Sequence, residues 1–209
     1  MKKIMLTTLI ASMLLLPLGS TALADYEEAP APAVSQDYLP GDMPAGTSPA
    51  DAMAPALHGV LLAMMNHDVQ SLDLSDGVLA WECLYNMLSL YGQLDSRSQM
   101  EDGLLLFPTE TVQDYAAALD LSLEALPPLP QELTDRLTFD RGGNVYQAVC
   151  GCDDLSQLQV REVRPVSGGL QLTGALVYVV EDLDLVQFQA TLQYRDSMFG
   201  FAVTGLALS

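Results

Sequence analysis

Three polar side chains stand out on a segment that is otherwise apolar. Glu82, Asn86 and Ser89 are spaced i, i+4, i+7 within residues 78–91, which places all three on one face of a helix. Such a stripe is more often the solvent edge of a buried helix. If it faced an enclosed cavity instead, burial would raise the pKa of the Glu82 carboxyl and suit it to act as a general acid or base. Glu82 is therefore the candidate catalytic residue, and Asn86 and Ser89 would orient a substrate.

Three cysteines and two histidines are the other side chains with reactive potential. Cys83 sits mid-helix among apolar residues and is expected in the core rather than as a nucleophile. Cys150 and Cys152 are separated by one residue, which is not the Cys-x2-Cys spacing of a structural zinc site. Two states stay open: a disulfide from Cys83 to Cys150 or Cys152, or three reduced thiols. His58 and His67 lie on an earlier helix, and nothing in the sequence predicts that they approach Cys150 and Cys152.

Acidic residues gather at the turns of the C-terminal half. Asp153 and Asp154 form one group, and Glu181, Asp182 and Asp184 form another. Carboxylates are the ligands that Ca²⁺ prefers, but neither group matches the Asp-x-[Asp/Asn]-x-[Asp/Asn]-Gly loop. We expect no cofactor, and the only candidate metal is Ca²⁺ held at low affinity by these carboxylates.

Two further segments could contact a partner. One is a row of uncharged side chains on a predicted strand, which could hydrogen-bond a glycan or a peptide if it is not simply a solvated face: Gln187, Gln189, Thr191 and Gln193, followed by Arg195. The other is the apolar run Leu104–Pro108. If Leu105 and Phe107 were exposed, this run could insert into a partner as an inhibitor's wedge, whereas burial would remove that idea.

The spacing of apolar residues divides the chain into a helical part followed by a part made of strands. A helical period predicts helices from Asp51 to about His67, from Val78 to Tyr91 with Gly92 ending it, and from Pro108 or Thr109 onward. From Thr138 the period becomes 2, and strands are predicted near 144–150, 157–164, 170–180, 185–195 and 199–208. Their short connections leave no room for helical crossovers, so the sheet is expected to be an antiparallel meander.

Helices followed by strands predict an α+β fold, with N-terminal helices packed on a C-terminal meander of four to five strands. Over roughly residues 78–208 this order resembles cystatin-like and nuclear-transport-factor-like (NTF2-like) half-barrels, in which a curled sheet wraps a long helix. The resemblance is one of architecture alone. It implies no site residues, because such folds include enzymes, inhibitors and binding domains.

The N-terminus predicts export. Residues 1–24 have the form of a secretory signal peptide, with Lys2 and Lys3, an apolar stretch and a small-residue cleavage site ending at Ala24. Residues 25–50 contain five prolines without apolar periodicity and are expected to be a disordered linker. Residues 51–209 are expected to form a single α+β domain, secreted or periplasmic, with no membrane span after cleavage.

Charge narrows the range of partners. The two lysines belong to the predicted signal peptide, so its removal takes the formal net charge from −19 to −21. Such a surface repels nucleic acid and favours a basic protein or peptide. Because no complete catalytic set is present, we expect a secreted bacterial binding or interaction domain that is not an enzyme. The alternatives are a small secreted hydrolase or lyase that uses Glu82, or an inhibitor of a secreted enzyme.

Overall fold

The computed structural model describes residues 48–209. The predicted signal peptide, residues 1–24, and residues 25–47 of the predicted linker lie outside the described residues. The described chain starts with Ser48, whose hydroxyl accepts a hydrogen bond from the Asp51 amide at 3.1 Å and caps helix α1 (Pro49–Ala52). Pro49 and Ala50 are thus helical, and the first helix begins two residues before Asp51, the start predicted from the sequence.

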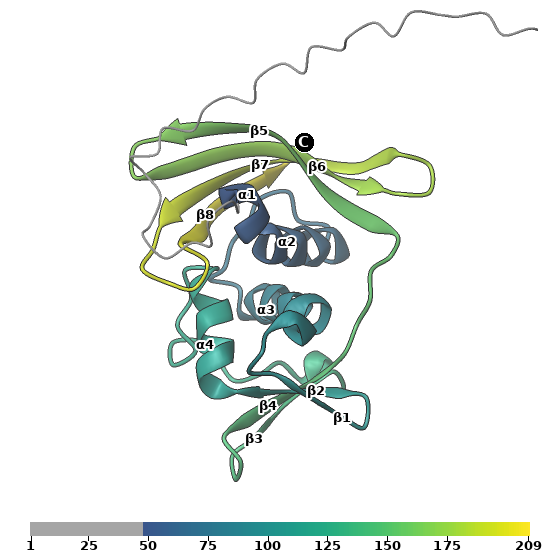
Figure 1. The fold of residues 1–209 in the computed structure, drawn as a ribbon, viewed down its shortest axis with the longest axis vertical. Helices are drawn as coiled ribbons and strands as arrows, with labels where there is room; N and C mark the ends of the chain where they lie inside the picture. The colour runs from purple at the N-terminus through teal and green to yellow at the C-terminus, as the bar shows by residue number, and fades with distance from the viewer. Residues whose placement is uncertain (1–47) are drawn as a thin grey trace, which may run out of the picture. The chain divides into compact units, whose positions relative to one another are not determined.

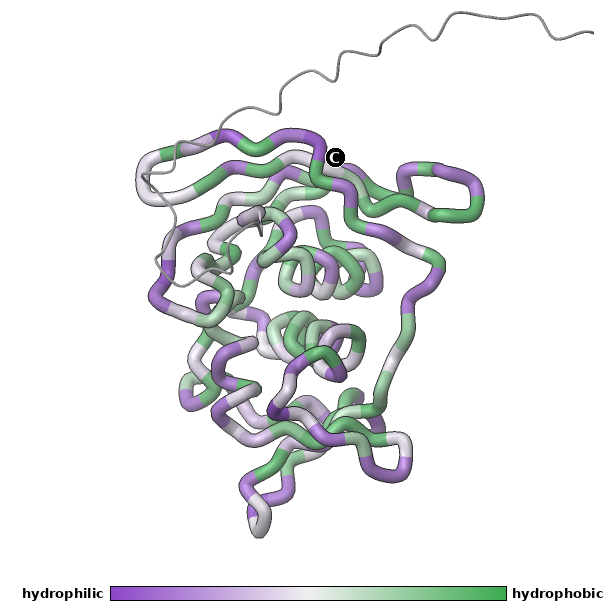
Figure 2. The backbone as a smooth tube through the Cα atoms, viewed as in Figure 1, coloured by the Kyte–Doolittle hydropathy of each residue, from purple (hydrophilic) through white to green (hydrophobic). Residues whose placement is uncertain are grey.

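Two long helices form the centre of the described part. Helix α2 (Ala54–Asn66) and helix α3 (Gly77–Tyr91) pack against each other, and Asp76 caps α3 by accepting a hydrogen bond from the Val78 amide at 2.9 Å. Both helices are apolar around most of their circumference, and they lie between two sheets (Figure 1). Hydrophobic residues accordingly follow both helices along their length (Figure 2).

The first sheet has the strand order β1-β2-β4-β3 and lies on the α3 side. It consists of β1 (Gln99–Glu101), β2 (Leu104–Pro108), β3 (Leu137–Asp140) and β4 (Val145–Val149), all antiparallel. Helix α4 (Thr109–Ala117) follows β2 directly, at the start predicted from the sequence. Two short 3-10 turns, Gly92–Leu94 and Gln131–Leu133, complete this half.

The second sheet is the predicted meander. Its strands β5 (Ser156–Val166), β6 (Gly169–Tyr178), β7 (Leu183–Tyr194) and β8 (Phe201–Leu208) pair with their neighbours in chain order, and this sheet lies on the α2 side. Along β7, Phe188, Ala190 and Leu192 are buried while Gln187, Gln189 and Gln193 are exposed, so the predicted alternation is confirmed. Each of the three pairings carries a β-bulge, which increases local twist.

The α+β class is confirmed, with two differences in how the strands assemble. The predicted strand 144–150 is β4, and it joins the other sheet by pairing with β2 and β3. Neither sheet closes, and α2 lies between the meander and α3, so the meander does not wrap the Val78–Tyr91 helix as the half-barrel resemblance implied. Residues 150–155, which leave β4 and enter β5, cross from one sheet to the other alongside both helices (Figure 1).

The apolar run Leu104–Pro108 is strand β2 and contributes to the core. Leu105 and Phe107 are 1 % and 0 % exposed. The predicted inhibitor wedge on this run is therefore wrong, because the two side chains that would insert into a partner fill the interior. Phe107 also explains the glycine that ends α3: a Cβ on Gly92 would lie 2.3 Å from the Phe107 Cζ atom, although the Gly92 φ of −61° is open to any residue.

Candidate functional site

Glu82 faces the end of α2. Its two carboxylate oxygens accept hydrogen bonds from Asn66 Nδ2 at 2.9 Å and from His67 Nε2 at 2.8 Å. Glu82 is 6 % exposed, and it lines none of the pockets described below. The carboxylate therefore ties α3 to the C-terminal end of α2, and both of its oxygens already have partners.

Asn86 and Ser89 are also buried and also bond within the fold. Asn86 Nδ2 donates to the Gly59 carbonyl on α2 at 3.1 Å, and Ser89 Oγ donates to the Val149 carbonyl on β4 at 2.8 Å. The stripe is therefore not a solvent edge, contrary to the commoner interpretation of its spacing. It supplies the polar contacts of a helix that is covered on nearly every side, since a buried polar group is costly unless it is hydrogen-bonded.

His58 is the centre of a second polar cluster that sequence reasoning did not find. Its Nδ1 atom lies 2.7 Å from the Tyr91 hydroxyl. On the other side of the ring, Nε2 lies 3.0 Å from Ser156 Oγ and 3.2 Å from an Asp153 carboxylate oxygen. The Ser156 hydroxyl also donates to Asp153. The structure thus brings a histidine of helix α2 against the segment that follows Cys150 and Cys152, a contact that no sequence pattern predicted. We call these four residues the His58 clasp.

The His58 clasp has the residue types of a catalytic triad but not its geometry. In a triad the nucleophile and the carboxylate sit at opposite ring nitrogens. Here Ser156 and Asp153 share Nε2, and Tyr91 occupies Nδ1. Because the Ser156 hydroxyl donates to Asp153, the histidine does not take up its proton. The arrangement fixes the chain that connects the two sheets onto α2 and α3.

Burial governs protonation in the clasp. It lowers the pKa of His58, although attraction to Asp153 opposes the shift, and it raises the pKa of the Tyr91 hydroxyl. Partial burial also pushes the pKa of Asp153 upward, but hydrogen bonds from Ser156 and Leu155 outweigh it and leave that pKa below its usual range. At neutral pH, His58 is therefore neutral and Asp153 is ionised.

The structure holds Cys83, Cys150 and Cys152 as free thiols. Cys83 is fully buried within α3 and forms no disulfide with Cys150 or Cys152 in the described chain. Burial and the neighbouring Glu82 raise the pKa of its thiol, so it is not a reactive nucleophile. Cys152 is exposed and lies with His58 and Asp154 on a small pocket of about 190 Å³.

The acidic turns do not assemble a ligand set for a metal. Within residues 48–209 no three His, Cys, Asp or Glu side chains lie together as a metal ion would need. Asp153 belongs to the His58 clasp. Asp184 receives both terminal nitrogens of Arg161, at 2.8 and 2.5 Å, and an amide hydrogen bond from Gln187 at 2.9 Å.

The acidic residues instead border an exposed apolar surface where β6 turns into β7. Five aliphatic side chains, between 42 % and 67 % exposed, make up what we call the hairpin surface: Leu155, Val179, Val180, Leu183 and Leu185. Backbone pairing brings their segments together, because the Val179 amide donates to the Leu155 carbonyl at 2.9 Å and Tyr178 pairs with Leu183. The exposed Asp154, Glu181 and Asp182 lie beside these residues in the chain, and Figure 2 shows a hydrophilic turn with hydrophobic chain next to it.

Part of this surface could have been read from the sequence. In strand β7, Leu183 and Leu185 have the same parity as Gln187 and Gln189, which face solvent. Apolar residues at positions that alternation assigns to water indicate an exposed patch. Leu155 could not be found in this way, because it reaches the hairpin surface only through the pairing of β5 with β6.

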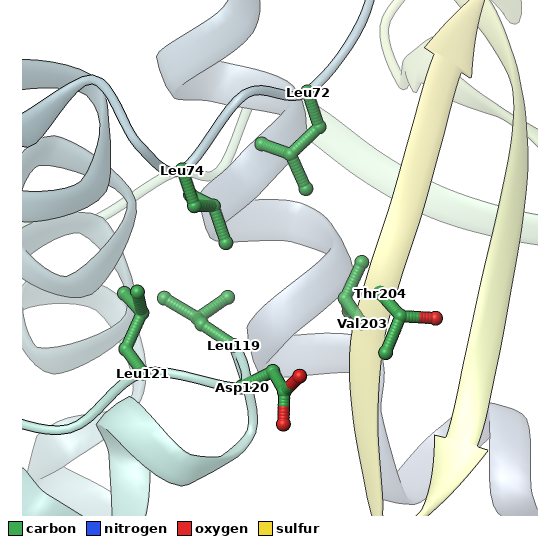
Figure 3. A pocket seen from close by; sticks show the side chains of 7 residues that line it. All are labelled: Leu72, Leu74, Leu119, Asp120, Leu121, Val203 and Thr204. Atoms are coloured by element: carbon green, nitrogen blue, oxygen red, sulfur yellow. The ribbon is translucent and has the colours of Figure 1, made fainter.

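The pockets of the described chain differ in volume. One crevice has a volume of about 190 Å³ and is lined by Leu72, Leu74, Leu119, Asp120, Leu121, Val203 and Thr204. Figure 3 shows Leu72, Leu74 and Leu119 directed into it. Ligand pockets usually enclose about 300 Å³ or more, so this crevice and the pocket beside Cys152 are small.

Two other pockets are larger. One, of about 390 Å³, lies over the predicted amide row and includes Gln187, Gln189, Thr173 and Arg161. The other, of about 340 Å³, lies at the end of α3 and is lined by Tyr91, Tyr115 and Phe199, among others.

Comparison with known proteins gives no relative: no family model, no curated protein and no solved structure matches the chain. Among residues 48–209, no helix is both long and apolar enough to cross a membrane. The candidate site is therefore defined by geometry alone, and its most prominent part is the hairpin surface.

Proposed function

We propose that this protein is an exported bacterial interaction domain without catalytic activity, and that it binds a basic protein or peptide through the hairpin surface. The observation that carries the proposal is the group of five aliphatic side chains left exposed beside a turn that is otherwise acidic. A patch of exposed apolar side chains lowers the solubility of a protein, so its presence on a protein surface is typical of a binding site.

Charge defines the partner's chemistry. Asp154, Glu181 and Asp182 have no ion pair among the described residues, whereas Asp184 is paired with Arg161. A partner with an apolar centre and basic residues around it would match both the aliphatic side chains and these carboxylates. The strong overall negative charge would also accelerate its approach and would repel nucleic acid.

The polar residues support a role without catalysis. The side chains of Glu82, Asn86, Ser89 and His58 all bond to other parts of the fold. A catalytic acid or base needs to reach the proton it transfers, and none of these groups is free to do so in the described chain. Export itself remains a proposal that rests on the signal-peptide pattern of residues 1–24.

Affinity capture with matched variants tests this function. The wild-type protein, a Val180→Ser/Leu183→Ser double variant and a Met100→Ser control would be immobilised and exposed to the envelope fraction and culture fluid of the producing organism. Met100 is 53 % exposed on β1, in the other sheet, so it matches the loss of an exposed apolar side chain elsewhere.

The wild type and the control should recover the same basic protein, and the double variant should lose it. Two half-exposed aliphatic side chains that become buried on binding contribute about 2 kcal/mol together, which corresponds to about thirtyfold in affinity. Equal recovery by all three proteins, or recovery of an acidic partner, would contradict the proposal.

A further inference from the structure

A concave site of about 340 Å³ lies where four segments meet, away from the hairpin surface. Its lining comes from the start of α2 at Pro55, the end of α3 at Tyr91, α4 at Tyr115 and the β7–β8 connection at Met198 and Phe199. The loop after α3 closes the remaining side. The volume falls within the range of small-molecule pockets, about 300–1,000 Å³. We call it the aromatic pocket.

Aromatic rings form its inner wall. Tyr115 and Phe199 are 4 % and 7 % exposed, and their rings meet edge to face with centroids 5.4 Å apart. Tyr91 is held by its hydrogen bond to His58. Burial raises the pKa of Tyr115 to about 12, so its hydroxyl is neutral at physiological pH. The wall is thus preorganised and presents electron-rich rings.

Charged groups form a second wall: Asp95 and Arg97 line the pocket, and Asp114, outside the lining, pairs with Arg97, so the three side chains together carry one net negative formal charge. The Arg97 guanidinium donates to both carboxylate oxygens of Asp95, at 3.0 and 2.8 Å, and to Asp114 at 2.6 Å. One cation thus faces two carboxylates. A ligand anion would have to displace one of these carboxylates from Arg97, whereas a ligand cation would meet the surplus negative charge.

Two exposed apolar side chains stand at the mouth. Leu94 is 78 % exposed, and Met198 is 50 % exposed with its sulfur 3.4 Å from Arg97 Nη2. A ligand that covers these side chains would bind with a more favourable free energy, because each of them presents apolar surface to water.

We propose that the aromatic pocket binds a small organic cation that carries an apolar ring. The ring would pack against the wall formed by Tyr91, Tyr115 and Phe199, and the cationic group would lie toward Asp95 and beside the aromatic rings, where cation–π attraction adds to charge attraction. This site shares no residue with the hairpin surface, so it does not depend on the proposed function.

Three indole derivatives that differ mainly in charge provide the probes. Tryptamine carries a positive charge, tryptophol is neutral and indole-3-acetate is negative. Each would be titrated into the ¹⁵N-labelled protein while amide chemical shifts are followed. Tryptamine should shift the amides of residues 94–97 and 198–199 saturably, and it should bind about tenfold more tightly than indole-3-acetate, with tryptophol between them.

Three substitutions localise the effect. Met198→Ala should weaken tryptamine binding about threefold or more, because it removes apolar cover at the mouth. Asp114→Asn keeps a hydrogen-bond acceptor for Arg97 but removes one negative charge, so it should narrow the difference between tryptamine and indole-3-acetate. Met100→Ala removes a side chain of similar exposure outside the pocket and should change nothing.

The proposal is overturned if tryptamine causes no saturable shifts, if the shifts map away from the aromatic pocket, or if indole-3-acetate binds as tightly as tryptamine. It is also overturned if Met198→Ala and Met100→Ala behave alike. Since Met198 and Met100 are both about half exposed, their variants should fold, and unchanged amide spectra outside the pocket would verify this.

Discussion

Acidification should destabilise the fold through His58. Because burial lowers the pKa of His58 in the folded protein, the unfolded chain takes up a proton at this residue as the pH falls through its ordinary value of 6.5, while the folded chain does so only at a lower pH. Acidification stabilises whichever state binds more protons, which here is the unfolded chain. The free energy of unfolding therefore falls below that pH. Each pH unit over which this difference persists costs about 1.4 kcal/mol.

The two histidines of the chain provide a built-in control. His58 is 4 % exposed, while the side chain of His67 is 34 % exposed. In His58→Gln, the amide can still donate toward Asp153 and accept from Tyr91 but cannot titrate. His67→Gln leaves the His58 clasp intact. Comparison between variants is necessary because acidification also reduces the repulsion among the many carboxylates, which stabilises all three proteins alike.

Urea unfolding, followed by fluorescence of the single tryptophan, Trp81, would measure the effect at about pH 7.5 and about pH 5.5. Relative to His58→Gln, the wild type should lose stability between these values, by up to about 1.4 kcal/mol, or up to about 6 °C in melting temperature. His67→Gln should follow the wild type. A wild-type loss that matches His58→Gln, or one that disappears in His67→Gln instead, would refute the assignment to His58.

Two further predictions follow from packing. Gly92→Ala should destabilise the fold by about 1–3 kcal/mol in the same urea assay, because the new Cβ would press on Phe107, whereas Gly205→Ala, with nothing within 4 Å of the added atom, should lose far less. Iodoacetamide, with peptide mapping by mass spectrometry, should alkylate Cys152 in the native protein and leave Cys83 unmodified until denaturant is added, because Cys83 is buried and its thiol pKa is raised; early labelling of Cys83 would show that α3 opens locally.

Local patterns predicted the long helices and strands β4 to β8, but they missed the short strands β1 and β3 and did not indicate which strands pair. Helix α3 begins within one residue of its predicted start because Asp76 caps it, and apolar residues alone determine most of its faces. Strand β4 was placed correctly in the sequence but assigned to the wrong sheet. Its partners are β2 and β3, and pairing between distant short strands leaves no periodic signal in either segment.

The two polar clusters show the same limit. The spacing of Glu82, Asn86 and Ser89 correctly predicts one helix face, but it does not say whether water, a cavity or another helix lies opposite. The His58 clasp is harder still, because His58 and Ser156 are 98 residues apart. An isolated histidine on an apolar helix gives no indication of its partner, since the contact depends on the path of residues 150–155 between the sheets.

That path explains why side chains suited to catalysis are used for structure. Residues 150–155 leave one sheet before they enter the other, so their polar groups cannot rely on strand pairing, and those that are buried need other partners. The Gly151 amide donates to the Ser89 carbonyl at 3.1 Å, and Ser89 Oγ holds Val149 just before the crossing. Asp153 reaches His58 at its far end. The buried Ser89 and His58 and the partly buried Asp153 thus hold the chain that joins the two sheets across a pair of apolar helices. By contrast, nothing in the described packing requires Val180 or Leu183 to be apolar.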